Sequence, residues 1–192
     1  MLMWYVVAAL VTVGVLSLFN LVFVAAVARR LRQLSAHGPA PMPIPEELKA
    51  ARMLSPGTVV PEFVANTVDG KAISRGTLAD ETLVAFLAPG CLPCEQLLPD
   101  LTRRAQAHPG GRERVLVALT AAHPEDAVRY VSRLADVAQV IVEDDRGEFS
   151  DAFRAIAFPV VYLVGEGGRV LAAGSGATAL ETLPVAAGAH AG

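Results

Sequence analysis

The hydrophobic positions of the chain begin with one long apolar run. Residues 1–28 carry no charged side chain, and a helix of this length rises about 40 Å, more than the ~30 Å hydrocarbon core of a bilayer. Trp4 and Tyr5 suit the membrane–water interface at one end, and basic residues begin at Arg29 at the other. We therefore predict one membrane-spanning anchor over residues 3–28.

Two other interpretations of this run are open. Ala26-Val27-Ala28 resembles a signal-peptide cleavage site, although no basic residue precedes the run and the run exceeds the usual ~7–15 apolar residues. The other interpretation is a buried core helix, which the length of the uncharged run disfavours. The anchor is favoured over both.

A linker is predicted over residues 29–54. Four prolines fall between residues 35 and 45, so we expect a semi-extended tether there. Residues 46–54 are compatible with a short amphipathic helix that Pro56-Gly57 would end.

From residue 55 onward the pattern changes to alternating strands and helices. A continuous apolar run predicts a strand over residues 82–88 that is buried on both faces. Leucines at helical spacing predict a helix over residues 94–107. The remaining predicted strands are residues 115–119, 140–142, 160–164 and 169–173, and the remaining predicted helices are residues 124–134 and 148–155. This alternation predicts an α/β fold with a central mixed sheet flanked by helices.

The predicted helix over residues 124–134 is amphipathic. Val128, Val131 and Leu134 lie at helical spacing and share one face of this helix. Pro124 suits the first helical position, where no backbone N–H is needed.

Turn residues join these elements and bound the domain. Glycines within residues 165–168 predict a hairpin between the last two strands, and Asp69-Gly70 predicts the turn of an N-terminal hairpin within residues 58–74. We place the folded domain at residues 55–176. A short C-terminal helix and a flexible tail are expected over residues 177–192.

Composition narrows the class of protein. Of the 192 residues, 53% are hydrophobic and 18% are charged, which is too apolar for a disordered chain. The net charge of −3 provides no basic field for binding nucleic acid, so we expect no nucleic-acid partner.

The candidate chemistry is a single C-x-x-C motif, Cys91-Leu92-Pro93-Cys94. It follows a buried strand and a Pro-Gly turn and opens a helix, where unpaired N–H groups and the helix dipole favour an anion. That position favours the thiolate form of Cys91, and thiolates are the nucleophiles of disulfide exchange. We predict that Cys91 attacks and that Cys94, almost one turn later, resolves the mixed disulfide.

Three alternative interpretations apply to the cysteines. A structural zinc site needs four ligands, but His108 and His123 are 14 residues apart, so no metal is expected. Inert core cysteines would have to fall at a helix start by chance. A peroxidatic cysteine of the peroxiredoxin type would need a Thr or Ser where this chain has Ala88. For the two histidines, capping or a solvated loop is the expected role.

A second motif, Phe158-Pro159, precedes an apolar strand. Proline is a poor strand interior but a good strand entry, and X-Pro bonds can be cis in tight turns. We expect a cis bond with the proline close to the Cys91 sulfur.

Together these features resemble the thioredoxin fold over roughly residues 55–173. The N-terminal anchor, the Pro-rich tether and the opening of the domain are similar to the redoxin branch, namely bacterial membrane-anchored thiol-disulfide oxidoreductases of the TlpA type, including the methylamine-utilisation accessory protein MauD. The resemblance implies that Phe158 and Pro159 form the cis-proline pair whose backbone binds an extended substrate. It implies no cofactor beyond the dithiol.

The chain departs from the thioredoxin pattern at several positions. Gly90 stands where an aromatic residue usually precedes the first cysteine, and Ala85 stands where thioredoxin has a buried carboxylate. Glu95 is adjacent to Cys94 and is expected to face solvent. The bulky Phe158 replaces the usual small or polar residue and is expected to narrow the range of clients.

The sequence thus predicts a membrane-tethered thiol-disulfide oxidoreductase. Its expected partners are protein thiol or disulfide clients and a membrane or soluble electron donor. A non-catalytic module that docks a client for maturation and a thiol peroxidase are the alternatives. The positive-inside rule would place the domain in the cytoplasm because arginines follow the anchor, but the resemblance favours a single-pass protein of the cell membrane with an extracytoplasmic domain.

Overall fold

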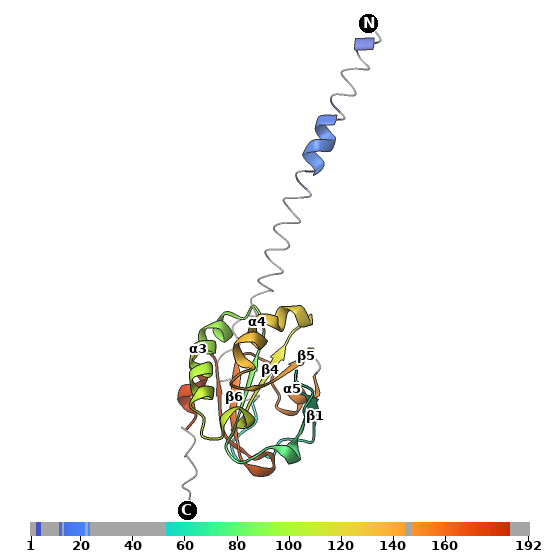
Figure 1. Cartoon of the computed structure of the whole chain (residues 1–192). Helices are drawn as coiled ribbons and strands as arrows, with labels where there is room; N and C mark the ends of the chain where they lie inside the picture. Colours follow the sequence, from blue (N-terminus) through green and yellow to red (C-terminus); the bar gives the residue numbers. More distant parts are fainter. Residues whose placement is uncertain are drawn as a thin grey trace, which may run out of the picture. The chain divides into compact units, whose positions relative to one another are not determined.

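The computed structural model describes residues 3–4, 12, 14–21, 23, 53–144 and 147–184. The chain divides into two units, Met1–Pro43 and Ile44–Gly192, which are considered separately (Figure 1). Most of the predicted anchor, the linker up to residue 52 and the C-terminal tail from residue 185 lie outside the described residues. In the first unit, residues 14–21 are helical. Among the residues that the structure describes, none of the helices has the length and apolar character needed to cross a membrane.

A five-stranded mixed sheet forms the centre of the second unit, which confirms the predicted α/β fold. Its order is β5-β4-β3-β6-β7. Strands β3, β4 and β5 are parallel, whereas β6 runs antiparallel to both β3 and β7. The strand bounds are β3 Thr82–Leu87, β4 Val115–Thr120, β5 Gln139–Glu143, β6 Val160–Val164 and β7 Val170–Ser175.

Helices cover one face of this sheet. The alternation of β3 side chains points Leu83, Ala85 and Leu87 toward α3 and α4. All three of these residues are fully or almost fully buried. The helices on this side are α3 (Leu92–Gln106), α4 (Pro124–Leu134) and the 3₁₀ turn η4 (Ala179–Thr182).

The opposite face packs against α5 (Glu148–Ala152) and an N-terminal hairpin. Its core is a set of aromatic rings whose centroids are 4.9–6.2 Å apart, within the range of favourable edge and offset contacts. The set comprises Phe63, Phe86, Phe149, Phe153 and Tyr162. The Tyr162 hydroxyl donates a hydrogen bond to the Phe153 carbonyl at 2.9 Å. Burial raises the pKa of Tyr162 to about 12.

The N-terminal hairpin consists of β1 (Val64–Asn66) and β2 (Ala72–Ser74). Gly70 adopts a φ of 81° in the connecting turn, as the sequence predicted, because glycine tolerates this left-handed conformation. The Val68 N–H donates to the Val140 carbonyl at 2.8 Å, so the hairpin covers the outer edge of β5.

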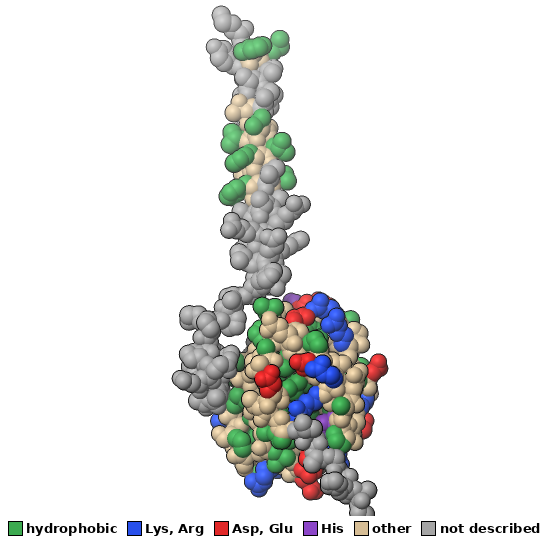
Figure 2. Space-filling model, turned by 90° about the vertical axis from the view of Figure 1, so that its left-hand side faces the viewer, with side chains coloured by type: hydrophobic (Ala, Val, Ile, Leu, Met, Phe, Trp, Pro, Cys, Tyr) green, Lys and Arg blue, Asp and Glu red, His purple; other side chains and the backbone are tan. Residues whose placement is uncertain are grey.

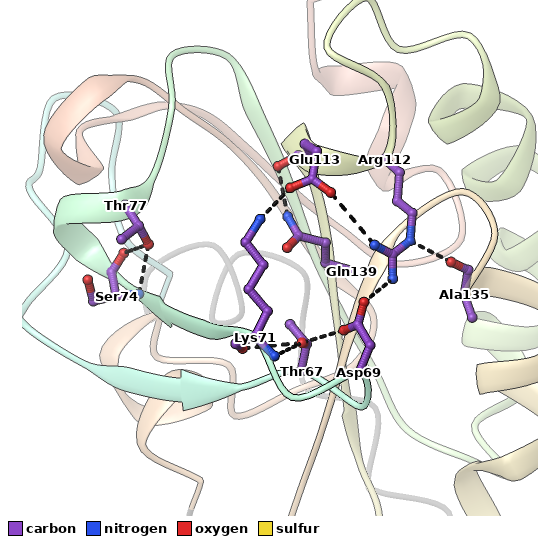
Figure 3. A network of polar contacts seen from close by, with 9 residues as sticks. All are labelled: Thr67, Asp69, Lys71, Ser74, Thr77, Arg112, Glu113, Ala135 and Gln139. Carbon is purple, nitrogen blue, oxygen red and sulfur yellow. Dashed lines mark hydrogen bonds and ion pairs between the residues drawn. The ribbon is translucent and has the colours of Figure 1, made fainter.

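A network of polar contacts fixes this hairpin to the rest of the domain (Figure 3). Arg112, in the 3₁₀ turn η2 (Gly111–Arg114), donates to Asp69 at 2.8 Å and to the Ala135 carbonyl at 2.6 Å. Hydrogen bonds from Thr67 and Arg112 lower the pKa of Asp69 to about 2. The network lies where β4 begins, at the opposite end of the parallel strands from the cysteines.

Two further 3₁₀ turns complete the domain. The turn η1 (Arg75–Thr77) follows β2 and was not predicted, whereas η3 (Glu166–Gly168) joins β6 to β7 as the predicted Gly-rich hairpin. Helix α5 ends at Ala152, three residues before the predicted end.

Side-chain burial decides two expectations. Of the apolar residues grouped on one face of α4, Leu134 is buried but Val128 is 62% exposed, and the buried residues of the helix are Ala127, Tyr130 and Leu134. The His108 side chain is buried and its Nδ1 accepts the Gly110 N–H at 3.2 Å, so its role is the local capping contact and not that of a solvated loop residue. This burial lowers the pKa of His108.

Candidate active site

The C-x-x-C motif lies at the junction of β3 and α3. Residues 88–90 connect the two, and Gly90 adopts a φ of 77°, a conformation that glycine adopts readily. Cys91 is the N-cap of α3 with extended backbone angles, and Pro93 lies in the first turn. Helix α3 therefore begins two residues before its predicted start, and both cysteines belong to its N-terminal end.

A disulfide bond joins Cys91 and Cys94, whose Cα atoms are 5.2 Å apart. The two sulfurs differ in accessibility. Cys91 is partly exposed, whereas Cys94 is completely buried. An incoming molecule can therefore reach Cys91 and not Cys94.

The helix start favours a thiolate at Cys91. The first N–H groups of a helix have no partner within the helix and carry a partial positive charge. Pro93 has no N–H to contribute, and the Glu95 N–H already donates to the Cys91 carbonyl at 3.1 Å. In the reduced state, the positive end of the helix dipole stabilises the thiolate relative to the thiol.

The Phe158-Pro159 segment lies beside Cys91. The Phe158–Pro159 bond is cis, as expected from the sequence. The Phe158 carbonyl oxygen is 3.6 Å from the Cys91 sulfur. Pro159 is buried, whereas the Phe158 side chain is half-buried and packs against both core clusters. The structure thus brings together both motifs that the sequence singled out.

The core beneath Cys94 is apolar. Ala85, at the thioredoxin carboxylate position, is completely buried and belongs to the same cluster as Cys94. The other members of that cluster around the start of α3 are Leu97, Leu98 and Leu101. Ala85 therefore places a methyl group in this core where thioredoxin has a carboxylate.

Glu95 does not simply face solvent, contrary to the sequence-based expectation. Its side chain is 31% exposed and forms an ion pair with Arg129. The Tyr130 hydroxyl donates a hydrogen bond to the Glu95 carboxylate at 2.8 Å. Burial and this hydrogen bond raise the pKa of Tyr130 to about 12. Both partners come from α4, more than 30 positions away, so no local sequence pattern revealed them.

The described residues contain no group of three or more His, Cys, Asp or Glu side chains that could hold a metal ion.

Comparisons with known proteins agree with this geometry. No family model matches the chain. The chain is 26% identical, over 111 residues, to the sporulation thiol-disulfide oxidoreductase A of Bacillus subtilis (strain 168), and the match covers 56% of this chain and 67% of that protein.

Solved structures show the same fold. A thio-disulfide isomerase from Thermus thermophilus matches with a TM-score of 0.53 and 22% identity, over 67% of this chain and 92% of that one. StoA from Bacillus subtilis matches with a TM-score of 0.50 and 21% identity, over 64% of this chain and 93% of that one.

The fold and the Cys91–Cys94 disulfide define the class of protein: the chain is a disulfide oxidoreductase with a thioredoxin-like fold. Within that class, the chain is similar to thioredoxin-like redoxins.

Proposed function

We propose that the protein exchanges disulfides with client proteins through Cys91 and Cys94. The observation that carries this proposal is the difference between the two sulfurs, one accessible at a helix N-terminus and the other buried. In the reduced protein, the Cys91 thiolate attacks a sulfur of a client disulfide and releases the other client sulfur as a thiolate. A mixed disulfide between Cys91 and the client results.

Cys94 then completes the reaction. Its thiol loses a proton, the resulting thiolate attacks the Cys91 sulfur, and the second client sulfur leaves as a thiol. The client gains two electrons, and the protein gains the Cys91–Cys94 disulfide. A membrane or soluble electron donor restores the dithiol by the same exchange, and the whole sequence is reversible.

Phe158 and Pro159 are proposed to bind the client. Since the Phe158 carbonyl is 3.6 Å from the Cys91 sulfur, an extended client segment that reaches this sulfur also comes within reach of that backbone. Leu92, next to Cys91 in the sequence, is 68% exposed and offers apolar contact area to the client. Pro93 completes the motif by occupying the first turn of α3.

Trapping of mixed disulfides tests the roles of the cysteines. Cys94→Ser should accumulate covalent complexes with clients in vivo, because the resolving thiol is gone, whereas Cys91→Ser should not. Nonreducing gels followed by mass spectrometry would detect and identify the complexes. Equal trapping by both variants, or by neither, would overturn the assignment. If the double Cys→Ser variant keeps full function in the cell, the protein is a docking module and not an exchange enzyme.

We further propose that the chain is tethered to the membrane as a single-pass protein with the domain on the outer face. In support, the described helical residues 14–21 are exposed throughout, and apolar side chains project from this unit (Figure 2), including Leu16, Leu18, Phe19 and Leu21 at 63–71%. Such side chains suit a lipid environment better than water.

The side of the membrane is tested by labelling. A membrane-impermeant maleimide should label Cys91 in intact cells after mild reduction, and labelling only after lysis would place the domain inside. We include in this proposal the resemblance to proteins of the TlpA type, including MauD, because that resemblance also depends on a membrane-tethered domain.

A further inference from the structure

A charged and hydrogen-bonded contact joins the start of α3 to α4. The Glu95 carboxylate accepts a hydrogen bond from the Tyr130 hydroxyl at 2.8 Å and forms an ion pair with Arg129. The Arg129 guanidinium also lies 5.9 Å from the centre of the Tyr130 ring. We refer to Glu95, Arg129 and Tyr130 as the Glu95 cluster.

The Glu95 cluster belongs to the same helix start as the attacking thiol. Cys91 is the N-cap of α3 and Glu95 lies in the first turn of that helix, where the Glu95 N–H donates to the Cys91 carbonyl at 3.1 Å. A Cys91 thiolate and a Glu95 carboxylate would be two negative charges at one helix start, and like charges repel each other. An unpaired Glu95 carboxylate would therefore oppose the thiolate form of Cys91 that the helix dipole favours.

Arg129 supplies the opposite charge at this point. Its pairing with Glu95 cancels the repulsion, and Tyr130 keeps the carboxylate turned toward α4. Because the pKa of Tyr130 is raised to about 12, its hydroxyl stays protonated and remains a donor throughout the neutral range.

Other charged groups near the site do not share this role. On α4 these are Glu125, Asp126 and Arg133, and on the segment before β6 the charged residue is Arg154; all four are exposed. In the described part of the chain, none of these four residues makes a hydrogen bond or ion pair with Glu95 or with either cysteine. Beneath the site, the β3 side chains on this face of the sheet, Leu83, Ala85 and Leu87, are apolar.

We propose that Arg129 and Tyr130 are positioning residues that neutralise and fix the Glu95 carboxylate, and thereby keep the Cys91 thiol acidic. The inference rests on the proposed function only in taking Cys91 as the attacking thiol. It assigns opposite effects to two partners in one contact: removal of the Glu95 charge favours the Cys91 thiolate, and removal of the Arg129 charge disfavours it.

The test measures the acidity of Cys91 in the full-length chain carrying Cys94→Ser, so that one thiol remains. The rate of carboxamidomethylation by iodoacetamide is followed against pH. From the Coulomb energy of two charges about one helical turn apart in water, Arg129→Gln should lower the acid dissociation constant of Cys91 about twofold and Glu95→Gln should raise it about twofold. The double variant should return close to the starting value.

Matched variants separate charge from structure. Arg129→Lys keeps the charge and should leave the acidity of Cys91 unchanged. Arg133→Gln removes the same charge one turn further along α4 and should also leave it unchanged. Thermal unfolding supplies the contrast, because Glu95→Gln and Arg129→Gln break the same contact and should both lower the melting temperature.

Opposite shifts in Cys91 acidity, together with stability changes of the same sign, support the inference. Shifts in the same direction, or no shift in either variant, would overturn it and leave the cluster a purely structural contact. These measurements need no client. A failure of Cys94→Ser to trap clients would thus count against the proposed function alone, and a failure of the charge reversal would count against the Glu95 cluster alone.

Discussion

The Cys91 sulfur lies 3.6 Å from the Phe158 carbonyl oxygen, although 67 positions separate the two residues. The sheet topology explains this contact. Strands β3 and β6 are antiparallel neighbours in which Phe86 pairs with Val160, so the end of β3 and the beginning of β6 meet at one edge of the sheet. Cys91 follows the first of these strands and Phe158 precedes the second. The central pairing of the fold therefore builds the site.

The two thiols of the reduced protein should differ in reactivity. Cys91 is partly exposed at the N-terminus of α3, whereas Cys94 is completely buried. We expect iodoacetamide to modify Cys91 at least about tenfold faster than Cys94, because both the thiolate character and the accessibility of Cys91 favour its reaction. Peptide mapping by mass spectrometry after short exposure measures the ratio. Equal modification of the two residues would contradict the assignment of Cys91 as the attacking thiol.

Phe158 should limit the size of the clients. Its half-buried ring packs against both core clusters beside Cys91. Phe158→Ala should lower the stability by about 2 kcal/mol, roughly half the loss for a fully buried phenylalanine. It should also raise the rate with a bulky protein disulfide relative to the rate with a small linear disulfide.

Ile156→Ala provides the matched control for Phe158. Ile156 belongs to the same segment but is 58% exposed, so its truncation should change stability little. Stopped-flow rates with oxidised insulin and with hydroxyethyl disulfide would give the ratio for each variant. If the ratio for Phe158→Ala equals that of the unmodified protein, Phe158 does not limit client size.

The sequence predicted most of the sheet because its strands are continuous apolar runs that are buried on both faces. Strands β3 and β6 and helix α4 begin where the pattern placed them. The two cysteines and the Phe158-Pro159 pair could also be recognised, because each is a contiguous motif next to a predicted strand. Their proximity followed from the resemblance to a known fold.

Features that depend on packing between distant helices were missed. The helical spacing on α4 favoured a face containing Val128, but the structure buries Tyr130, whose ring fills more space and whose hydroxyl reaches Glu95. Apolar residues recur with the same helical period on the face with Val128 and on the face with Tyr130. The elements that pack against α4 therefore decide which face is buried. The contact between Glu95 and α4 was not visible from the sequence for the same reason.

Ala85→Asp should place an ionisable group in the apolar core beneath Cys94. Ala85 is completely buried, so the folded state should raise the pKa of the new carboxyl above its unfolded value of about 3.9. The folded state then binds more protons than the unfolded state above about pH 4, and the stability falls as the pH rises. Urea unfolding at several pH values measures this dependence.

Ala85→Asn is the matched control for the carboxyl group. It introduces a side chain of nearly the same shape with no titration, so its destabilisation should change little between pH 4 and pH 7. The difference in stability between the two variants should be small near pH 4 and grow toward pH 7. A difference independent of pH would show that the new side chain reaches solvent and that the core beneath Cys94 is open.

Tyr162 should make the protein sensitive to alkaline pH. Burial raises its pKa in the folded state to about 12, whereas an unfolded tyrosine has a pKa of about 10. This contribution to stability is complete below pH 10 and is lost as the pH rises from about 10 to 12, at up to ~1.4 kcal/mol per pH unit.

Tyr162→Phe removes the titration, and it also removes the hydrogen bond to the Phe153 carbonyl. At pH 8 the variant should therefore be less stable than the unmodified protein by about 1 kcal/mol. Near pH 11 the difference in stability should shrink or reverse, because only the unmodified protein loses the contribution of Tyr162. Urea unfolding of both proteins at pH 8 and pH 11 measures the two differences, and a constant difference would mean that the Tyr162 hydroxyl titrates normally in the folded state.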